Sequence, residues 1–243
     1  MNSVIGKVVT ILKELRHAEA GTSASELARV LNMPGQTVHR LLKELGEGGL
    51  VWQDSVTKRW SLGPILIGLG EMARKQVSLI ALTHPYLESL TNETRETTIL
   101  TVREGNYGVY VDIIESPQRI RLVEYVGARW PLHVGCSRRA ILAFLGEDEI
   151  TEFAEIHCQN ESQRKQLISE CHDIRERGYA ISLGEVTPDS FGVAAPIVYG
   201  NVPVASIMAG GPKERMGGNE LDYFGELVRR IANEVSSTFA GSK

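Results

Sequence analysis

The sequence lacks the long apolar runs and paired cysteines that mark several classes of protein. No run of about 18 uncharged apolar residues occurs, so no transmembrane helix is expected. The first residues lack the apolar core and the small-residue cleavage site of a signal peptide. The three cysteines, Cys136, Cys158 and Cys171, are an odd number without a CxxC pair. This pattern argues against a disulfide scaffold and favours a reducing, cytoplasmic location.

Sequence signatures of catalysis are also missing. There is no GxSxG, no HExxH and no phosphate-binding P-loop motif. Gly68 and Gly70 lack the third glycine of a dinucleotide-binding fingerprint, and nothing in the sequence supports a triad of His133, Cys136 and Asp189. We therefore expect no catalytic residue, no cofactor and no enzyme activity.

Two dipeptides, His157-Cys158 and Cys171-His172, have the residue types of metal ligands. Neighbouring side chains on a helix point about 100° apart, which suits a tetrahedral zinc site poorly. We expect no metal site, and a structural zinc is the minor alternative.

The composition that is present is that of a globular protein with an uneven charge. Hydrophobic residues make up 42% of the 243 positions, enough for one large or two small domains. Residues 1–75 hold ten basic and seven acidic side chains, whereas the remainder holds 16 basic and 23 acidic ones. A mildly basic head on an acidic body favours a head that binds a polyanion.

The head, residues 1–63, has the spacing of a winged helix-turn-helix. A first helix is predicted over 4–15 by apolar residues at helical spacing: Ile5, Val8, Val9, Leu12 and Leu15. Ser23 and Glu26 have the spacing of a capping box, which opens a second helix. Pro34 suits the first turn of a third helix.

The third helix, over 35–46, carries the functional signal. One side is an apolar stripe of Val38, Leu41, Leu42 and Leu45. The opposite arc carries Gln36, His39, Arg40 and Lys43, with Thr37 at its edge. Glutamine can pair with adenine, arginine with guanine and lysine with phosphate, so this helix is expected to enter a major groove.

Two strands of a hairpin are predicted after this helix, over 50–53 and 59–62, and they complete a wing. Lys58 and Arg59 of the 54–59 loop are the expected phosphate contacts. An alternative is a metabolite-binding or interaction module whose head has lost DNA binding, because charged outer faces are often only solvated. The outer face of residues 36–43 distinguishes the two hypotheses.

A further helix, over 64–77, is expected to join the head to the body. Its apolar stripe consists of Ile65, Leu66, Leu69, Met72 and Ala73. We expect this stripe to form a dimer seam, because helix-turn-helix proteins generally bind two half-sites.

The body, residues 78–243, alternates between strand and helix signals. It begins with a helix over 78–94 and ends with one over 218–239. Strands are predicted over 97–102, 107–115, 120–126, 179–183, 193–198 and 204–209, and helices over 137–145, 147–157 and 161–177. The order predicts an α+β body around a mostly antiparallel sheet.

The sequence resembles the IclR family of bacterial transcriptional regulators over almost its whole length. The stretches that carry the resemblance are SELARVLNMPGQTVHRLLKEL, RWSLGPILIGLG, WPLHVGCSRRAILAFL, ERGYAISLGEVTPDSFGVAAPIV and IMAGGP. The resemblance implies a winged helix-turn-helix, a linker helix and a C-terminal GAF-like α/β effector-binding domain. It also implies a repressor or activator that binds double-stranded operator DNA and a small organic or aromatic acid, as a homodimer or a tetramer made of two dimers.

The resemblance places base and phosphate contacts at Gln36, Thr37, His39 and Arg40. Two positions depart from the family pattern, since Gly35 stands where lysine or arginine is common and Gln36 where serine is common. The missing cation at 35 removes a phosphate contact. We expect this to alter the operator preference more than the ability to bind DNA.

The resemblance also places an effector pocket around 133–139 and the late strands. Its expected residues are Cys136, Ser137, Arg138, Ser182, Gly192, Met208 and Gly210. In some members an acid, a thiol and two hydroxyls occupy the last four positions. Two glycines in their place are expected to add volume, and Met208 a soft apolar wall, so a roomier and less polar pocket is predicted.

A larger, partly apolar acid is the expected effector of such a pocket. One hypothesis is that Arg138 or Arg139 binds its carboxylate at the start of a helix. The alternative is that both arginines lie on the surface or at a subunit interface, because charged side chains are rarely buried.

Overall fold

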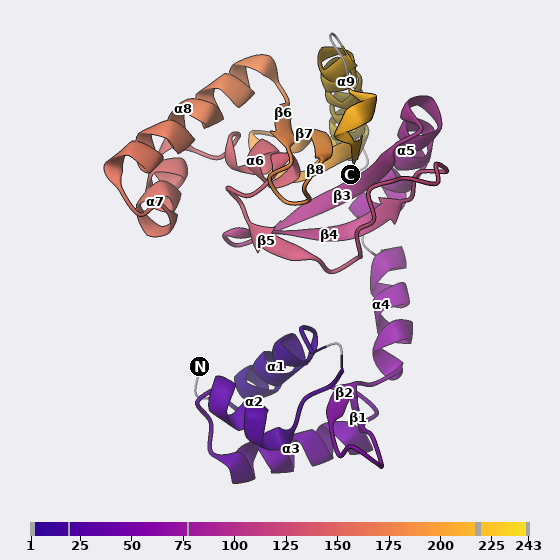
Figure 1. Cartoon of the computed structure of the whole chain (residues 1–243), viewed down its shortest axis with the longest axis vertical. Helices are drawn as coiled ribbons and strands as arrows, with labels where there is room; N and C mark the ends of the chain where they lie inside the picture. The colour runs from indigo at the N-terminus through magenta and orange to yellow at the C-terminus, as the bar shows by residue number, and fades with distance from the viewer. Residues whose placement is uncertain (1–2, 19, 77, 217–219, 242–243) are drawn as a thin grey trace. The chain divides into compact units, whose positions relative to one another are not determined.

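The chain folds into two compact units, Met1–Gln76 and Val77–Lys243 (Figure 1). The computed structural model describes residues 3–18, 20–76, 78–216 and 220–241. Over these ranges no helix combines the length and the apolarity that crossing a membrane requires.

The first unit is a winged helix-turn-helix followed by a helix, as predicted. Its elements are α1 (Val4–Leu15), α2 (Ala24–Val30), α3 (Gly35–Glu47), β1 (Val51–Gln53), β2 (Trp60–Leu62) and α4 (Ile65–Gln76). The capping box forms at the start of α2, where the Glu26 amide donates to Ser23 Oγ at 3.1 Å and the Ser23 amide to Glu26 Oε2 at 2.9 Å. Pro34 is the residue before α3 rather than part of its first turn.

The core of the first unit lies between the three helices and the hairpin. It consists of Ile11, Leu15, Leu27, Val38, Leu41, Leu42, Leu45, Val51 and Trp60. The apolar stripe predicted for α3 is therefore confirmed. The helix predicted over 4–15 is confirmed as α1, although Ile11 is buried whereas Ile5 and Val9 are exposed. Because α1 is apolar on more than one side, spacing alone does not decide which side packs.

Helix α4 presents much of its apolar surface to solvent in the single chain. Ile65 is 48% exposed, Ile67 71% and Leu69 54%, whereas Leu66 is half-buried. The side chains of Met72 and Ala73, also expected on this stripe, lie outside the described part of the chain.

The second unit is an α+β domain around one antiparallel sheet, as predicted. Its strands are β3 (Thr97–Glu104), β4 (Tyr107–Ile114), β5 (Arg129–Pro131), β6 (Ala180–Leu183), β7 (Ser190–Tyr199) and β8 (Val202–Pro212). Their order in the sheet is β5-β4-β3-β8-β7-β6, and every neighbouring pair is antiparallel.

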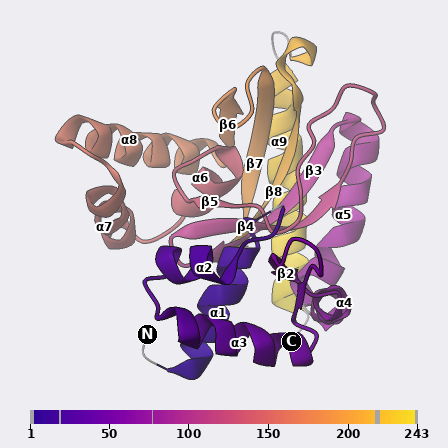
Figure 2. The same cartoon turned by 60° about the horizontal axis from the view of Figure 1, so that its bottom comes forward.

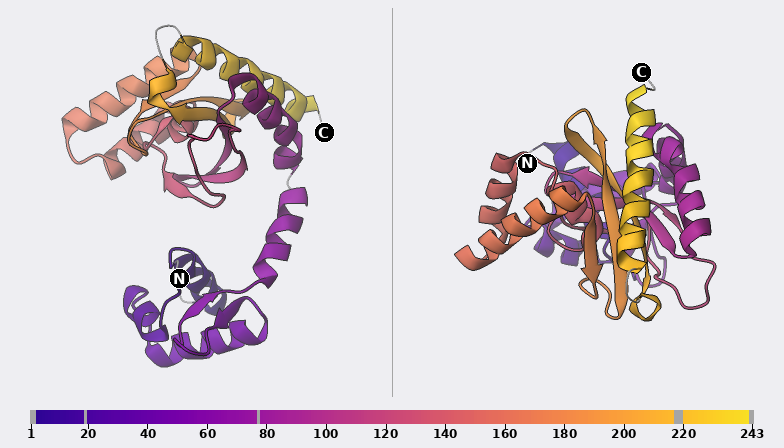
Figure 3. Two further views of the ribbon diagram at one scale, coloured as in Figure 1. Left: turned by 45° about the vertical axis from the view of Figure 1, so that its right-hand side comes forward. Right: turned by 90° about the horizontal axis from the view of Figure 1, so that it is seen from above.

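Helices cover both faces of this sheet. Helices α5 (Ser78–Thr94) and α9 (Glu220–Gly241) lie side by side on one face (Figure 3). Helix α6 (Cys136–Leu142) packs on the other face, and α7 (Glu147–His157) and α8 (Glu161–Arg177) extend beyond it (Figure 2). A core cluster of buried residues fills each layer.

The strand predicted over 120–126 is wrong. Residues 115–128 cross the α6 side of the domain as an irregular segment, in which Leu122 points inward while Val123 and Tyr125 are exposed. Gly127 has a φ of 92° and turns the chain. As a result β5, rather than 120–126, pairs with β4.

The centre of the sheet joins segments that are distant in sequence. Strand β3 pairs with β8, so that Thr97 lies opposite Gly210. Strand β7 pairs with the other side of β8, so that Gly192 also lies opposite Gly210. Since α6 packs on β7 and β8, this pairing brings the predicted effector residues together at one place.

Candidate functional site

The outer face of α3 carries the predicted polar side chains. Gln36, His39, Arg40 and Lys43 are exposed and Thr37 is half-buried. Arg40 Nη1 lies 2.7 Å from Glu44 Oε1, and the two side chains are 59% and 53% exposed. An exposed pair of this kind contributes little stability, so the guanidinium can exchange Glu44 for an acceptor on another molecule.

The wing loop is held by a carboxylate. Asp54 Oδ1 accepts hydrogen bonds from the amides of Val56 and Thr57 at 3.0 and 2.6 Å. These bonds, with that from Thr57 first, hold the pKa of Asp54 below its usual value. Lys58, with a φ of 58°, is exposed at the end of this loop.

Arg59 differs from Lys58, because it holds the wing against the rest of the first unit. Its Nη1 lies 3.2 Å from the Gly21 carbonyl oxygen and 3.4 Å from Glu26 Oε2. A phosphate contact at Arg59 would therefore have to replace Glu26. A phosphate contact at Lys58 does not require the replacement of Glu26.

The predicted effector residues meet in one small cavity beneath α6. Six of the seven line it, and they are Cys136, Ser137, Arg138, Ser182, Gly192 and Met208. Gly210 lies directly behind Met208, since a Cβ atom built there would be 2.6 Å from Met208 Cε. The cavity also contacts Gly135 of the predicted 133–139 stretch. Seven further lining residues were not predicted, and they are Tyr110, Leu122, Glu124, Val186, Thr187, Ser190 and Phe191.

The pocket that was predicted to be roomier than in other family members is small in this structure, and its size relative to theirs stays a prediction. The cavity has a volume of about 30 Å³, which is room for only a few water molecules. A Cβ atom at Gly192 would lie 2.7 Å from Cys136 Sγ and 3.3 Å from Met208 Cε. The space that the two glycines open is therefore filled by the Met208 thioether and the Cys136 thiol.

The two neighbouring arginines of α6 have different surroundings. Arg138 is 1% exposed and lines the cavity. Arg139 points away, with Nη2 2.6 Å from Glu185 Oε1 and 2.9 Å from the Ile181 carbonyl oxygen. The alternative that both arginines lie on the surface is therefore wrong for Arg138.

Burial changes the acid–base behaviour of the cavity. Desolvation raises the pKa of the Cys136 thiol to about 12, so this thiol is protonated at neutral pH. Desolvation also raises the pKa of Glu124, against the opposing effect of the Arg138 charge. The pKa of Tyr110 is raised for the same reason.

The sequence contained signals for some of the cavity-lining residues that were not predicted. Gly108, Tyr110 and Asp112 alternate on the buried face of β4, so the strand prediction indicated that Tyr110 points inward. Leu122 and Glu124 share one side of the 115–128 segment, as alternation implied, although no strand forms there. No signal marked Val186 or Thr187, which belong to a loop.

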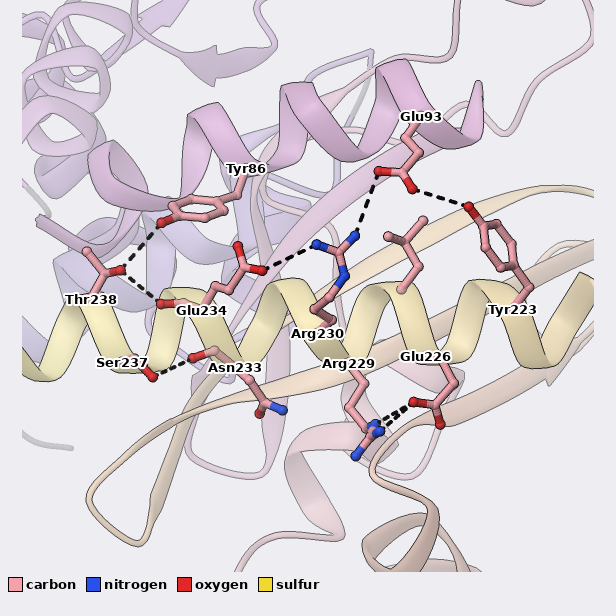
Figure 4. Close-up of a pocket in the computed structure, with 11 residues that line it drawn as sticks. Tyr86, Glu93, Tyr223, Glu226, Arg229, Arg230, Asn233, Glu234, Ser237 and Thr238 are labelled. Atoms are coloured by element: carbon pink, nitrogen blue, oxygen red, sulfur yellow. Dashed lines mark hydrogen bonds and ion pairs between the residues drawn. The ribbon is translucent and has the colours of Figure 1, made fainter.

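A larger hollow of the second unit lies elsewhere, between α5 and α9. It has a volume of about 910 Å³ and is open to solvent. Figure 4 shows that its side chains pair with one another: Arg230 with Glu93 and Glu234, Tyr223 with Glu93, and Arg229 with Glu226. Because these charges are already paired and well hydrated, this groove lacks the character of a ligand site.

The two dipeptides with metal-ligand residue types do not meet. His172 Nε2 lies 3.1 Å from Glu147 Oε2 at the start of α7, whereas His157 ends that helix and stacks on Phe153 at 4.2 Å. The two ends of an 11-residue helix are about 15 Å apart. In the described part of the chain, no three histidine, cysteine or acidic side chains are placed to hold a metal ion.

Comparison with known proteins agrees with both units. A model of the IclR helix-turn-helix domain matches residues 4–55, and one of the C-terminal domain of bacterial IclR regulators matches residues 72–237. The HTH-type transcriptional regulator KipR of Bacillus subtilis (strain 168) is 30% identical over 242 residues, covering 97% of this chain and 96% of KipR.

Solved structures share the fold. An IclR-type putative regulator from a Silicibacter species has a TM-score of 0.85 at 21% identity and covers 99% of this chain and 97% of its own. An IclR homologue from Microbacterium hydrocarbonoxydans in complex with 4-hydroxybenzoate has a TM-score of 0.80 at 21% identity, covering 99% of this chain and 100% of its own.

Proposed function

Because the chain belongs to the IclR family of ligand-responsive, DNA-binding transcriptional regulators, we propose which of its residues contact operator DNA and which bind the effector. Helix α3 enters the major groove of operator DNA, where Gln36, His39 and Arg40 face base edges. Thr37, Lys43 and the wing residues Lys58 and Arg59 contact the phosphate backbone. The observation that carries this assignment is the polar face of α3, whose reverse side is entirely packed into the core.

We propose that two heads act together in a homodimer, or in a tetramer made of two dimers. The first unit exposes apolar side chains on two of its helices, with Ile5 on α1 at 76% and Ile67 on α4 at 71%. Burying such side chains against a second subunit contributes about 1.5–3 kcal/mol for each large one. Two heads also fit operators with two half-sites about one helical turn apart.

The effector in this proposal is a small organic or aromatic acid that binds in the cavity beneath α6. The structural neighbour that holds 4-hydroxybenzoate and the buried guanidinium of Arg138 both support an acid. The protein acts in the bacterial cytoplasm, where its operator lies, and no membrane is involved.

Ligand and DNA are linked through the two units. The effector binds one arrangement of the second unit more tightly, and α4 transmits the change to the spacing of the two heads. An effector can shift operator affinity only by its differential affinity for the two arrangements. Whether the effector releases or recruits DNA decides between repression and activation.

The test is a titration of the purified protein against the DNA upstream of its own and neighbouring genes, at two salt concentrations. Specific binding that resists competitor DNA and weakens as salt rises is expected. Weak binding that is equal on all DNA sequences, with and without acids, would instead favour an interaction module that has lost DNA binding.

A further inference from the structure

The position of the Arg138 guanidinium in the effector cavity is fixed by contacts along the whole Arg138 side chain. A Cβ atom at Gly108 of β4 would lie 2.7 Å from Arg138 Cγ, so the glycine makes room for this side chain. The guanidinium carbon lies 4.6 Å from the centre of the Tyr110 ring. Nη1 donates to the Val134 carbonyl oxygen at 3.0 Å. These contacts fix the position of the guanidinium and use one of its three nitrogens.

The other two nitrogens have no acceptor. Among the described residues, none accepts a hydrogen bond from Arg138 Nε or Nη2, although both atoms are buried. A buried donor without a partner costs about 1–3 kcal/mol, and more when it is charged. The cavity therefore contains a donor edge that gains stability when an external acceptor arrives.

In Arg215 the same Nε–Nη2 edge binds a carboxylate. Arg215 uses its Nε and Nη2 to hold the two carboxylate oxygens of Glu96, each at 2.6 Å. This bidentate geometry is the one in which arginine binds carboxylates most strongly. Arg139 is not available in this way, because it already binds Glu185 and the Ile181 carbonyl.

We propose that the Nε–Nη2 edge of Arg138 binds the carboxylate of the effector, and that the effector is a monocarboxylate with an apolar body. This inference rests on the proposed function, since it specifies the ligand of the same cavity. Glu124 lines the cavity as well, and its carboxylate would repel a second carboxylate, so dicarboxylates are expected to bind more weakly. The apolar body would contact Leu122, Phe191 and Met208.

Met208 is the side chain that makes way for this body. The cavity of about 30 Å³ is too small for an organic acid, and the Met208 thioether fills the space in front of Gly192 and Gly210. Methionine has three rotatable side-chain bonds and adapts readily to new neighbours. When the acid enters, it therefore displaces the Met208 thioether from the space in front of the two glycines.

Calorimetric titration of the full-length protein tests the proposal with defined probes. The probes are benzoate and 4-hydroxybenzoate, the neutral 4-hydroxybenzamide and the dicarboxylate terephthalate. The variants are Arg138→Gln, Glu124→Gln and, as a matched control, Arg103→Gln, whose ion pair with Glu149 lies outside the cavity. Arg138→Lys keeps the positive charge but lacks the paired donors of the guanidinium, and it replaces Arg138→Gln in the titrations if that variant does not fold.

Substitutions at Arg138 and Glu124 are expected to change the affinity for the monocarboxylate in opposite directions. At least one monocarboxylate binds the wild type about tenfold or more tighter than the amide and the dicarboxylate. Arg138→Gln weakens it about 10- to 100-fold, in line with one bidentate charged contact, and Arg138→Lys weakens it less. Glu124→Gln tightens it, because a like charge is removed, and Arg103→Gln leaves it unchanged.

Equal binding of acid and amide, unaltered acid binding by Arg138→Gln, or no binding of any monocarboxylate would overturn this inference. None of these outcomes affects the DNA-binding part of the proposed function, which fails if the wild type does not distinguish operator from random DNA. The two failures are therefore separable in one set of proteins.

Discussion

Helix α3 carries its polar side chains on one continuous element, whereas the cavity beneath α6 is assembled from separate segments: β4, residues 115–128, α6, the stretch from Ser182 to Gly192, and β8. On α3 the four polar side chains are exposed, and Arg40 pairs with Glu44 one turn further along the same helix. In the cavity Met208 of β8 lies against Gly192 of the neighbouring strand β7 and against Gly210 of its own strand. Substitutions on α3 should therefore act independently, while substitutions in the cavity should be coupled.

The largest expected effect is in the cavity, at Met208. Met208→Ala removes a buried side chain and is expected to lower the free energy of unfolding by about 2–5 kcal/mol without ligand. It should also shift acid preference towards larger acids, because the thioether no longer occupies the space. Denaturant unfolding and calorimetry measure the two effects.

Leu42→Ala is the matched control in the first unit, because Leu42 is also fully buried. It is expected to lower stability by a comparable amount and to leave acid affinity unchanged. If Met208→Ala left both stability and acid preference unaltered, Met208 would not be the side chain that fills the cavity.

A smaller effect is expected on the outer face of α3. Arg40→Ala should cost about 1–3 kcal/mol of specific operator binding if the guanidinium contacts a guanine edge. The free energy of unfolding should change by less than about 0.5 kcal/mol, since only an exposed ion pair is lost. Glu44→Ala removes the partner of Arg40 and should not weaken DNA binding. Equal loss of operator and random-DNA affinity in Arg40→Ala would contradict a base contact.

A gain of function is expected at the start of the same helix. A Cβ atom at Gly35 would meet nothing within 4 Å, so Gly35→Lys fits without strain and restores the cation that is common in the family. The salt dependence of DNA binding should steepen by about one phosphate contact. Gly35→Ala is the control for helix propensity, and an unchanged salt slope in Gly35→Lys would show that position 35 does not face the backbone.

The smallest effect is on the pH dependence of the first unit. Bonds from the Ser23 amide and from the Thr22 and Ser23 side chains hold the pKa of Glu26 below its usual value. Stability from this carboxylate is present above its unfolded pKa and is lost as pH falls through its folded pKa. Thermal unfolding of the first unit between pH 5 and 3 should therefore depend less on pH in Glu26→Gln than in the wild type. Equal profiles would show that Glu26 does not contribute.

The comparison also explains what the sequence could predict. The face of α3 was predicted residue by residue, because one helical period decides which side is buried. The six cavity residues were found through the family resemblance, but the volume was not, because Met208 fills space contributed by β7 and β8 together. The 120–126 strand failed for a similar reason, since alternation describes a side-chain pattern and not the presence of a neighbouring strand.

The central claim is that the cavity and the DNA-binding helix are linked. The most direct test is to measure operator affinity with and without the monocarboxylate that binds the cavity, and acid affinity with and without operator. The account predicts that the acid changes operator affinity, and that the operator changes acid affinity by the same factor. An acid that occupies the cavity and leaves operator affinity unchanged would contradict it.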